Sequence, residues 1–205
     1  MWLDMNIQDI PVIVTTQRLV GPRLDVVYPV VSGNINYWIL QKINSEILNM
    51  VYFLLKKQGY FENPFTTVTG TYELKNNQRG ILSLSIINYA FAGGAHGMTY
   101  IKSLTFDVAT GRTYMLSDLF IRGSDYISRL SEIIRRQIAE RDLPLINEFQ
   151  SINPEQDYYI ADKALVIYFQ LYDLTPYAYG FPYFPISVYE IQDIIDENGP
   201  LGKLG

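Results

Sequence analysis

Apolar residues recur three and four positions apart over one long stretch of the chain, the spacing of an amphipathic helix. The stretch is flanked by Ser32-Gly33-Asn34, which supplies cap residues, and by Gly59, which suits a helix end. Lys56 and Lys57 suit the negative end of the helix dipole. The pattern predicts a helix whose apolar face is formed by Ile39, Leu40, Ile43, Ile47, Leu48, Val51, Leu54 and Leu55.

Two further segments carry helix signals. The first begins near Ser124 or Asp125, and its apolar stripe comprises Ile127, Leu130, Ile133, Ile134 and Ile138. The other begins at Ser187, where Ser187-x-x-Glu190 fits a capping box and Val188, Ile191, Ile194 and Ile195 would face inward. Both segments are predicted to be helices.

Period-two alternation dominates the middle of the chain and predicts an antiparallel meander over residues 66–75, 80–92 and 98–108. Before the first helix, Val- and Ile-rich stretches at 12–19 and 23–28 are broken by prolines, which confine strands to edges or ends. After the second helix, residues 164–172 indicate a buried strand.

The order of these elements predicts an α+β fold, an antiparallel meander sheet with helices packed on one face. We expect two lobes that share a sheet and a core, with the boundary at the glycines of residues 93–97. The expected domains are therefore an N-terminal one over residues 1–95 and a C-terminal one over residues 96–198.

Composition narrows the classes of function. The chain has 205 residues, is 48% hydrophobic and carries a net charge of −5, with no basic stripe, so nucleic-acid binding is not expected. A mildly acidic surface favours a basic partner. Cysteine is absent, which excludes disulfides and thiolate chemistry. The sequence has no apolar run of membrane-spanning length and no signal-peptide pattern, so its location stays open.

Residues 90–100, AFAGGAHGMTY, hold the single histidine, His96, among three glycines. The glycines favour a bend between two strands, which His96 could brace by a hydrogen bond. Alternatively, His96 joins a binding surface or acts as a general base beside Asp107 or Asp118. No nucleophile elbow or phosphate-binding loop is present, and one histidine cannot build a multi-histidine metal site. We therefore expect no cofactor and no metal.

The stretch YDLTPYAYGFPYFPISVYE, residues 172–190, combines closely spaced prolines with many aromatic rings. The proline spacing argues against a regular helix or a central strand and predicts an ordered, extended loop. The rings either cover a sheet edge or anchor a partner, as exposed tyrosines often do. The candidate binding residues are Tyr172, Tyr177, Tyr179, Phe181 and Tyr183, together with His96.

Three stretches, AFAGGAHG, SLTFDVATGRTYMLSDLF and ALVIYFQLYDLTPYAYGFPYFPIS, resemble the extracytoplasmic lysozyme-sensing domain of the anti-sigma factor RsiV. The N-terminal part, including LDVVYPVVSG, resembles the companion domain of unknown function that also occurs in the peptidoglycan deacetylase PdaC. The resemblance covers roughly residues 10–195. It implies an α+β fold outside the cytoplasmic membrane and direct binding of lysozyme, and it implies no catalytic residues.

Three functional hypotheses follow. The first is a non-catalytic, extracytoplasmic binding module that recognises a basic, lysozyme-like protein or peptidoglycan. The second is a cell-wall hydrolase or esterase that uses His96 with a carboxylate. The third is a structural envelope protein with no small ligand.

Overall fold

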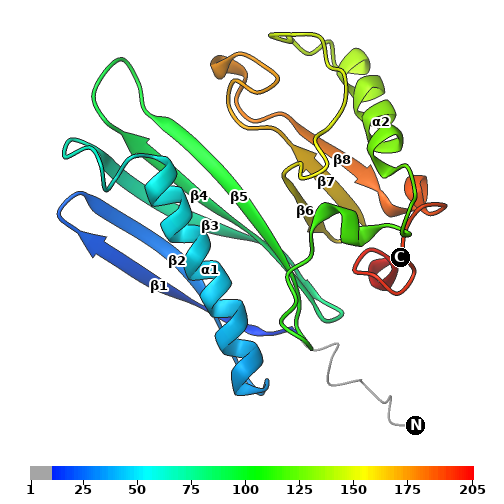
Figure 1. Cartoon of the computed structure of the whole chain (residues 1–205), viewed down its shortest axis with the longest axis horizontal. Helices are drawn as coiled ribbons and strands as arrows, with labels where there is room; N and C mark the ends of the chain where they lie inside the picture. Colours follow the sequence, from blue (N-terminus) through cyan, green and yellow to red (C-terminus); the bar gives the residue numbers. More distant parts are fainter. Residues whose placement is uncertain (1–10) are drawn as a thin grey trace. The chain divides into compact units, whose positions relative to one another are not determined.

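The computed structural model describes residues 11–205, which divide into two compact units, one ending at Thr113 and one spanning Tyr114–Gly205 (Figure 1). We call them unit 1 and unit 2. The elements of unit 1 are β1 (Ile13–Gly21), β2 (Leu24–Ser32), α1 (Tyr37–Lys57), β3 (Thr67–Gln78), β4 (Ile81–Phe91) and β5 (Met98–Asp107).

The five strands of unit 1 form one sheet in the order β1-β2-β3-β4-β5. All neighbours are antiparallel except β2 and β3, which are parallel and are connected through α1. The predicted meander over β3, β4 and β5 is confirmed. One side of α1 packs on a single face of the sheet (Figure 1) and buries Ile43, Ile47, Val51, Leu54 and Leu55 among the strand side chains.

The predicted first helix is confirmed, but it begins at a different cap. Asn36 is the N-cap, and its Oδ1 accepts a hydrogen bond of 2.9 Å from the backbone nitrogen of Trp38. Of the expected cap residues, Ser32 ends β2, whereas Gly33 and Asn34 lie in the connection that leads to the helix. At the other end Gly59 has φ +74° and Lys56 and Lys57 occupy the last turn, as the sequence indicates.

Unit 2 holds a three-stranded antiparallel sheet in the order β6-β7-β8 and one α-helix. Its elements, in which η denotes a short 3-10 helix, are η2 (Leu116–Leu119), α2 (Tyr126–Glu140), β6 (Tyr158–Ala161), β7 (Ala164–Tyr168), η3 (Tyr177–Tyr179), β8 (Tyr183–Ser187), η4 (Val188–Ile191) and η5 (Gly202–Leu204). The predicted second helix is confirmed: Asp125 caps α2 by accepting from the nitrogen of Ser128, and the helix buries Leu130, Ile133, Ile134 and Ile138.

The prediction of a helix from Ser187 is wrong, because only the single 3-10 turn η4 forms there. Ser187 does cap it by accepting from the nitrogen of Tyr189. The Glu190 carboxylate, however, accepts from Arg136 of α2 instead of closing a capping box. A long-range ion pair has thus replaced the local bond that the spacing suggested.

The proline-rich stretch is only partly a loop, since Tyr183–Ser187 forms strand β8 with Pro185 inside it. Pro185 lies opposite Val166 on an edge strand, where a missing N–H removes no bond to a further strand. Its carbonyl accepts a hydrogen bond of 2.8 Å from the amide of Gln137. The buried strand expected over residues 164–172 is shorter, because β7 ends at Tyr168.

The α+β class is confirmed, but the expectation that the two lobes share one sheet is wrong for residues 11–205. The described strands belong to two sheets, and each unit has its own cluster of buried apolar side chains. The boundary expected at residues 95/96 falls inside the β4–β5 hairpin, whose strands pair over Ile81–Ala90 and Met98–Asp107. The compact units divide instead between Thr113 and Tyr114.

Candidate functional site

His96 lies on the exposed turn that joins β4 to β5. Gly93 and Gly94 have φ +92° and +106°, the left-handed region that favours glycine. Gly97 is required for space, because a Cβ there would lie 2.4 Å from Cζ of Tyr89. His96 Nδ1 lies 2.9 Å from the carbonyl oxygen of Gly97. The glycines therefore serve the bend between two strands, with His96 against the backbone of the turn.

The carboxylates proposed as partners of His96 have other roles. Asp107 ends β5 at the opposite end from His96, about 30 Å along an extended strand. Its Oδ1 accepts from the backbone nitrogens of Ala109 and Thr110, both at 2.9 Å, and so shapes the turn after β5. Asp118 lies in η2 and accepts from the nitrogen of Met115 at 2.9 Å. A His96–Asp107 catalytic pair does not form.

The tyrosine loop, which we define as residues 172–183, presents two rings to solvent. Tyr172 is 47% exposed and Tyr179 is 39% exposed. The ring of Tyr177, which is half-buried, lies 5.6 Å from that of Tyr172, centroid to centroid. Tyr172 has φ +70°, a costly conformation for a residue with a side chain, so its direction is held by the surrounding structure.

Arg141, at the C-terminal end of α2, holds the tyrosine loop from one side. Its Nη1 donates to the carbonyl of Tyr183 at 2.8 Å and its Nη2 donates to the hydroxyl of Tyr179 at 3.2 Å. Its guanidinium carbon lies 5.2 Å from the ring centroid of Phe184. One side chain thus fixes both the base of the loop and the orientation of an exposed ring.

The other two predicted aromatic residues pack inward. Tyr183 is half-buried and lies within an aromatic cluster on β6–β8, at centroid distances of 5.8 Å from Tyr168 and 6.2 Å from Tyr159. Phe181 is half-buried and lies 6.5 Å from Tyr183. The predicted binding set therefore separates into anchoring rings and the presented rings of Tyr172 and Tyr179.

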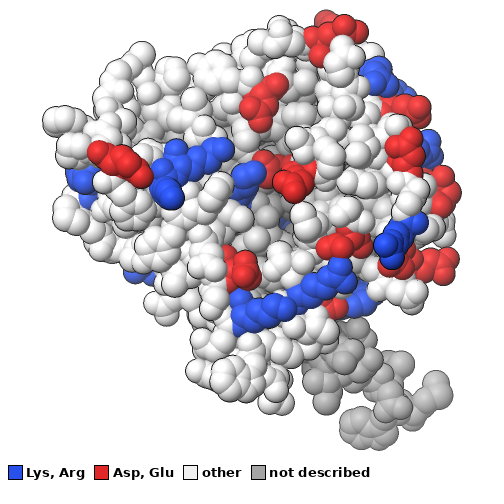
Figure 2. All heavy atoms as spheres, viewed as in Figure 1, with Lys and Arg blue, Asp and Glu red and all other residues white. Residues whose placement is uncertain are grey.

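Charge is divided unevenly between the units. Residues 114–205 carry seven Lys and Arg against fourteen Asp and Glu, a net charge of −7, whereas residues 11–113 carry nine against five, a net charge of +4. Figure 2 shows acidic side chains dominating the surface on the side of α2. The overall charge of −5 conceals this division, which pattern reasoning on the whole chain missed.

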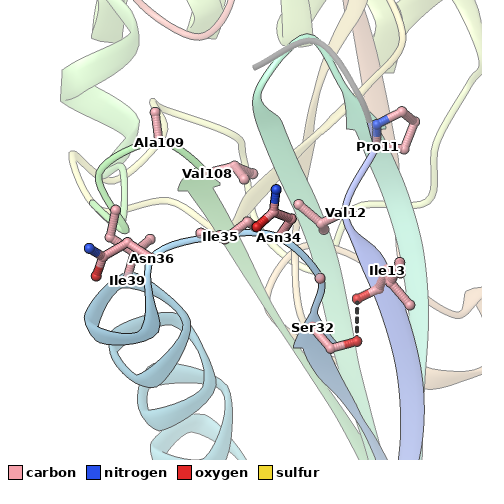
Figure 3. A pocket seen from close by; sticks show the side chains of 11 residues that line it. Pro11, Val12, Ile13, Ser32, Asn34, Ile35, Asn36, Ile39, Val108 and Ala109 are labelled. Carbon is pink, nitrogen blue, oxygen red and sulfur yellow. Dashed lines mark hydrogen bonds between the residues drawn. The ribbon is translucent and has the colours of Figure 1, made fainter. Parts of the chain in front are cut away.

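A pocket with a volume of about 540 Å³ lies within unit 1, where the start of β1, the end of β2, the link to α1 and the turn after β5 meet (Figure 3). Apolar side chains such as Val12, Ile35 and Val108 line it, with the amides of Asn34 and Asn36 as polar groups. No ionisable side chain is among its lining residues. The pocket can hold a small neutral ligand and provides no acid–base group.

Within residues 11–205, no three or more His, Asp or Glu side chains gather in a way that could hold a metal ion. None of the helices described there is long and apolar enough to cross a bilayer.

Two family models match the chain, one in each unit. Residues 117–189 match the family described as Protein of unknown function (DUF3298). Residues 22–99 match the family described as Deacetylase PdaC. The two matched ranges fall on either side of the division at Thr113 and Tyr114. The expected relation to the PdaC domain is therefore confirmed.

Two solved structures are similar to the chain over nearly its whole length. One is a member of the DUF3298 family from Pseudomonas aeruginosa, with 16% identity, a TM-score of 0.70, and coverage of 93% of this chain and 97% of that one. The other, from Bacteroides fragilis, has 14% identity, a TM-score of 0.67, and coverage of 94% and 95%. At these identities the likeness shows a common fold. No curated protein sequence matches the chain.

Proposed function

We propose that the chain is a non-catalytic binding module of the cell envelope, and that unit 2 docks a basic, lysozyme-like protein through the tyrosine loop. The observation that carries the proposal is the exposure of Tyr172 and Tyr179 on a backbone held by Arg141. Tyrosine is favoured at interface anchors because its ring buries a large apolar area with little loss of conformational entropy.

Charge supports a basic partner for this unit. Unit 2 has a net charge of −7, and Asp173 lies directly beside Tyr172 in the loop. Complementary charge raises the rate of association and excludes partners of like charge. The negative charge of unit 2 attracts a strongly basic protein such as a C-type lysozyme. The resemblance to the RsiV sensor domain points to the same partner.

The proposed location rests on the family matches. The name of the matching family, Deacetylase PdaC, and the resemblance to extracytoplasmic domains both favour the envelope.

The other aromatic residues of the predicted set pack against neighbouring rings. Phe181 packs against Tyr183, and Tyr177 packs against Tyr172. His96 belongs to unit 1 and is proposed as a residue of the turn and not as a general base.

Isothermal titration calorimetry of the whole chain with a C-type lysozyme, at low and at physiological salt, tests the proposal. We expect saturable binding that weakens as salt rises, because complementary charge contributes to association. Cytochrome c, a basic protein of another fold, is the control. Absence of heat with lysozyme, or equal affinity for cytochrome c, would contradict the proposal.

A second candidate ligand is favoured by the pocket of unit 1. Its apolar lining and asparagine amides suit a neutral group that joins a methyl to an amide, such as the N-acetyl group of a cell-wall glycan. Titration with soluble chitin oligosaccharides tests this candidate. Perturbed amide resonances at Asn34 and Asn36 would support it, and an unchanged spectrum would exclude it.

A further inference from the structure

The outer face of α1 carries exposed aromatic rings and lysines, and none of them belongs to the tyrosine loop. Successive helix residues turn by about 100°, so Trp38, Lys42, Asn49, Phe53 and Lys56 all fall within a sector of about 60°. This sector lies opposite the residues that α1 buries against the sheet. Trp38 is 77% exposed and Phe53 is 48% exposed. We call these five residues the α1 stripe, and it extends about 27 Å along the helix.

Aromatic residues gather at both ends of the α1 stripe. At the start of the helix, the rings of Tyr37 and Trp38 meet edge to face with centroids 5.5 Å apart, so the two rings stabilise each other in an exposed position. At the other end Tyr52 is exposed next to Phe53 in the sequence, and two more exposed phenylalanines, Phe61 and Phe65, follow within eight residues of the helix end.

Positive charge accompanies these rings. The charged side chains of α1 are Lys42, Glu46, Lys56 and Lys57, and residues 11–113 as a whole carry a net charge of +4. Both lysines of the stripe are exposed. This combination of exposed rings with lysines is typical of helices that lie at a lipid–water interface.

We propose that the α1 stripe docks unit 1 on an anionic lipid bilayer, with Trp38 and Phe53 entering the headgroup region. Two observations favour lipid over a glycan. The stripe is the convex side of a helix, which gives a sugar no groove, and Phe61 and Phe65 have no hydrogen-bonding group for a polar ligand. This surface, its unit and its partner all differ from those of the lysozyme proposal.

Tryptophan fluorescence gives a direct readout, because the chain has only two tryptophans, Trp2 and Trp38. In the full chain carrying Trp2→Phe, Trp38 is the single tryptophan. We expect its emission to shift to the blue on addition of phosphatidylglycerol-containing vesicles and to be quenched by lipids brominated along the acyl chain. Pure phosphatidylcholine vesicles should give a much smaller shift. An unchanged emission spectrum with anionic vesicles would overturn the proposal.

Vesicle sedimentation of variants separates the rings from the charges. The pair Lys42→Glu and Lys56→Glu, and separately the pair Trp38→Ala and Phe53→Ala, should each weaken binding to anionic vesicles by about tenfold or more. The matched control, Tyr172→Ala with Tyr179→Ala, removes two exposed rings from unit 2 and should bind as the parent does. Equal loss of vesicle binding in the control would overturn the proposal. So would a parent chain that forms a dimer, binds no vesicles and becomes monomeric on Trp38→Ala.

Discussion

The guanidinium of Arg141 donates to the hydroxyl of Tyr179 across 3.2 Å and so joins the end of α2 to the tyrosine loop. A second donor of the same side chain reaches the carbonyl of Tyr183 at 2.8 Å. A planar, forked cation can make both bonds at once, which an ammonium group on a flexible stem does less well. The presented ring is thus oriented before any partner arrives.

Arg141→Lys tests this pre-organisation. The variant keeps the charge but loses the fork, so we expect about fivefold weaker binding to the basic partner through added loop disorder. Thermal unfolding should show a loss of about 1 kcal/mol in the free energy of unfolding. Arg135→Lys is the matched control, because Arg135 donates to the carbonyl of Gln150 and stacks on Phe149 away from the loop. Equal affinities for the two variants would refute the role of Arg141.

Gly97→Ala tests the close packing of the β4–β5 turn. A Cβ would lie 2.4 Å from the Tyr89 ring and 2.5 Å from the carbonyl oxygen of Ala90, so the backbone or the ring must move. We expect a loss of about 1–3 kcal/mol in the free energy of unfolding, measured by denaturant titration. Ala95→Ser, in the same exposed turn, should change it by less than about 0.5 kcal/mol. Adding Tyr89→Ala should restore part of the loss.

Asn36→Ala removes the N-cap of α1. The nitrogen of Trp38 then loses its side-chain acceptor, and we expect a loss of about 1 kcal/mol in the free energy of unfolding, measured by thermal unfolding. Asn36→Asp keeps an acceptor at the positive end of the helix dipole and should preserve the stability. Asn34→Ala lies outside the helix and is the neighbouring control. If Asn36→Ala were no less stable than Asn34→Ala, the assigned cap would be incorrect.

Asp25 should titrate below the usual range of an aspartate. The hydrogen bonds from Arg18, at 2.7 and 2.6 Å, lower the pKa of its carboxyl. Because the folded pKa is lowered, the pair's contribution to stability is present above the unfolded pKa and is lost as the pH falls through the folded value. Carbon-detected NMR titration checks this, and Arg18→Gln should return the pKa to its ordinary range. An identical titration in both proteins would rule out the pair.

The sequence predicted most of the helices and strands, because the spacing of apolar residues within each element reflects which of its faces is buried. The apolar spacing from Ile39 to Leu55 and the alternation in β4 each correspond to one face of one element. The helix expected at Ser187 is only one 3-10 turn, and its Glu190 bonds to Arg136, a partner fifty-four positions away that local spacing does not reveal. Pro185 could enter a strand only because β8 is an edge, and strand order is a tertiary property.

The sequence predicted which residues make up the candidate site but not how their side chains are oriented. The tyrosine-rich stretch identified the segment that we propose as the docking site, yet which rings are presented depends on Arg141 and on the positive φ of Tyr172. Neither relationship has a sequence spacing that would reveal it. The exposure of Trp38 was not predicted either. The apolar spacing identifies the buried face of the helix and says nothing about aromatic rings that lie outside that face.

The central claim is that the two presented tyrosines form a docking surface for a basic, lysozyme-like protein. The most direct test is calorimetry of C-type lysozyme against the parent chain and against Tyr172→Gly with Tyr179→Ala, where glycine suits the positive φ at residue 172. We predict an affinity at least about thirtyfold weaker for the double variant, as expected when interface anchors are lost, with an unchanged circular dichroism spectrum. Equal affinity of a folded double variant and the parent would contradict the account.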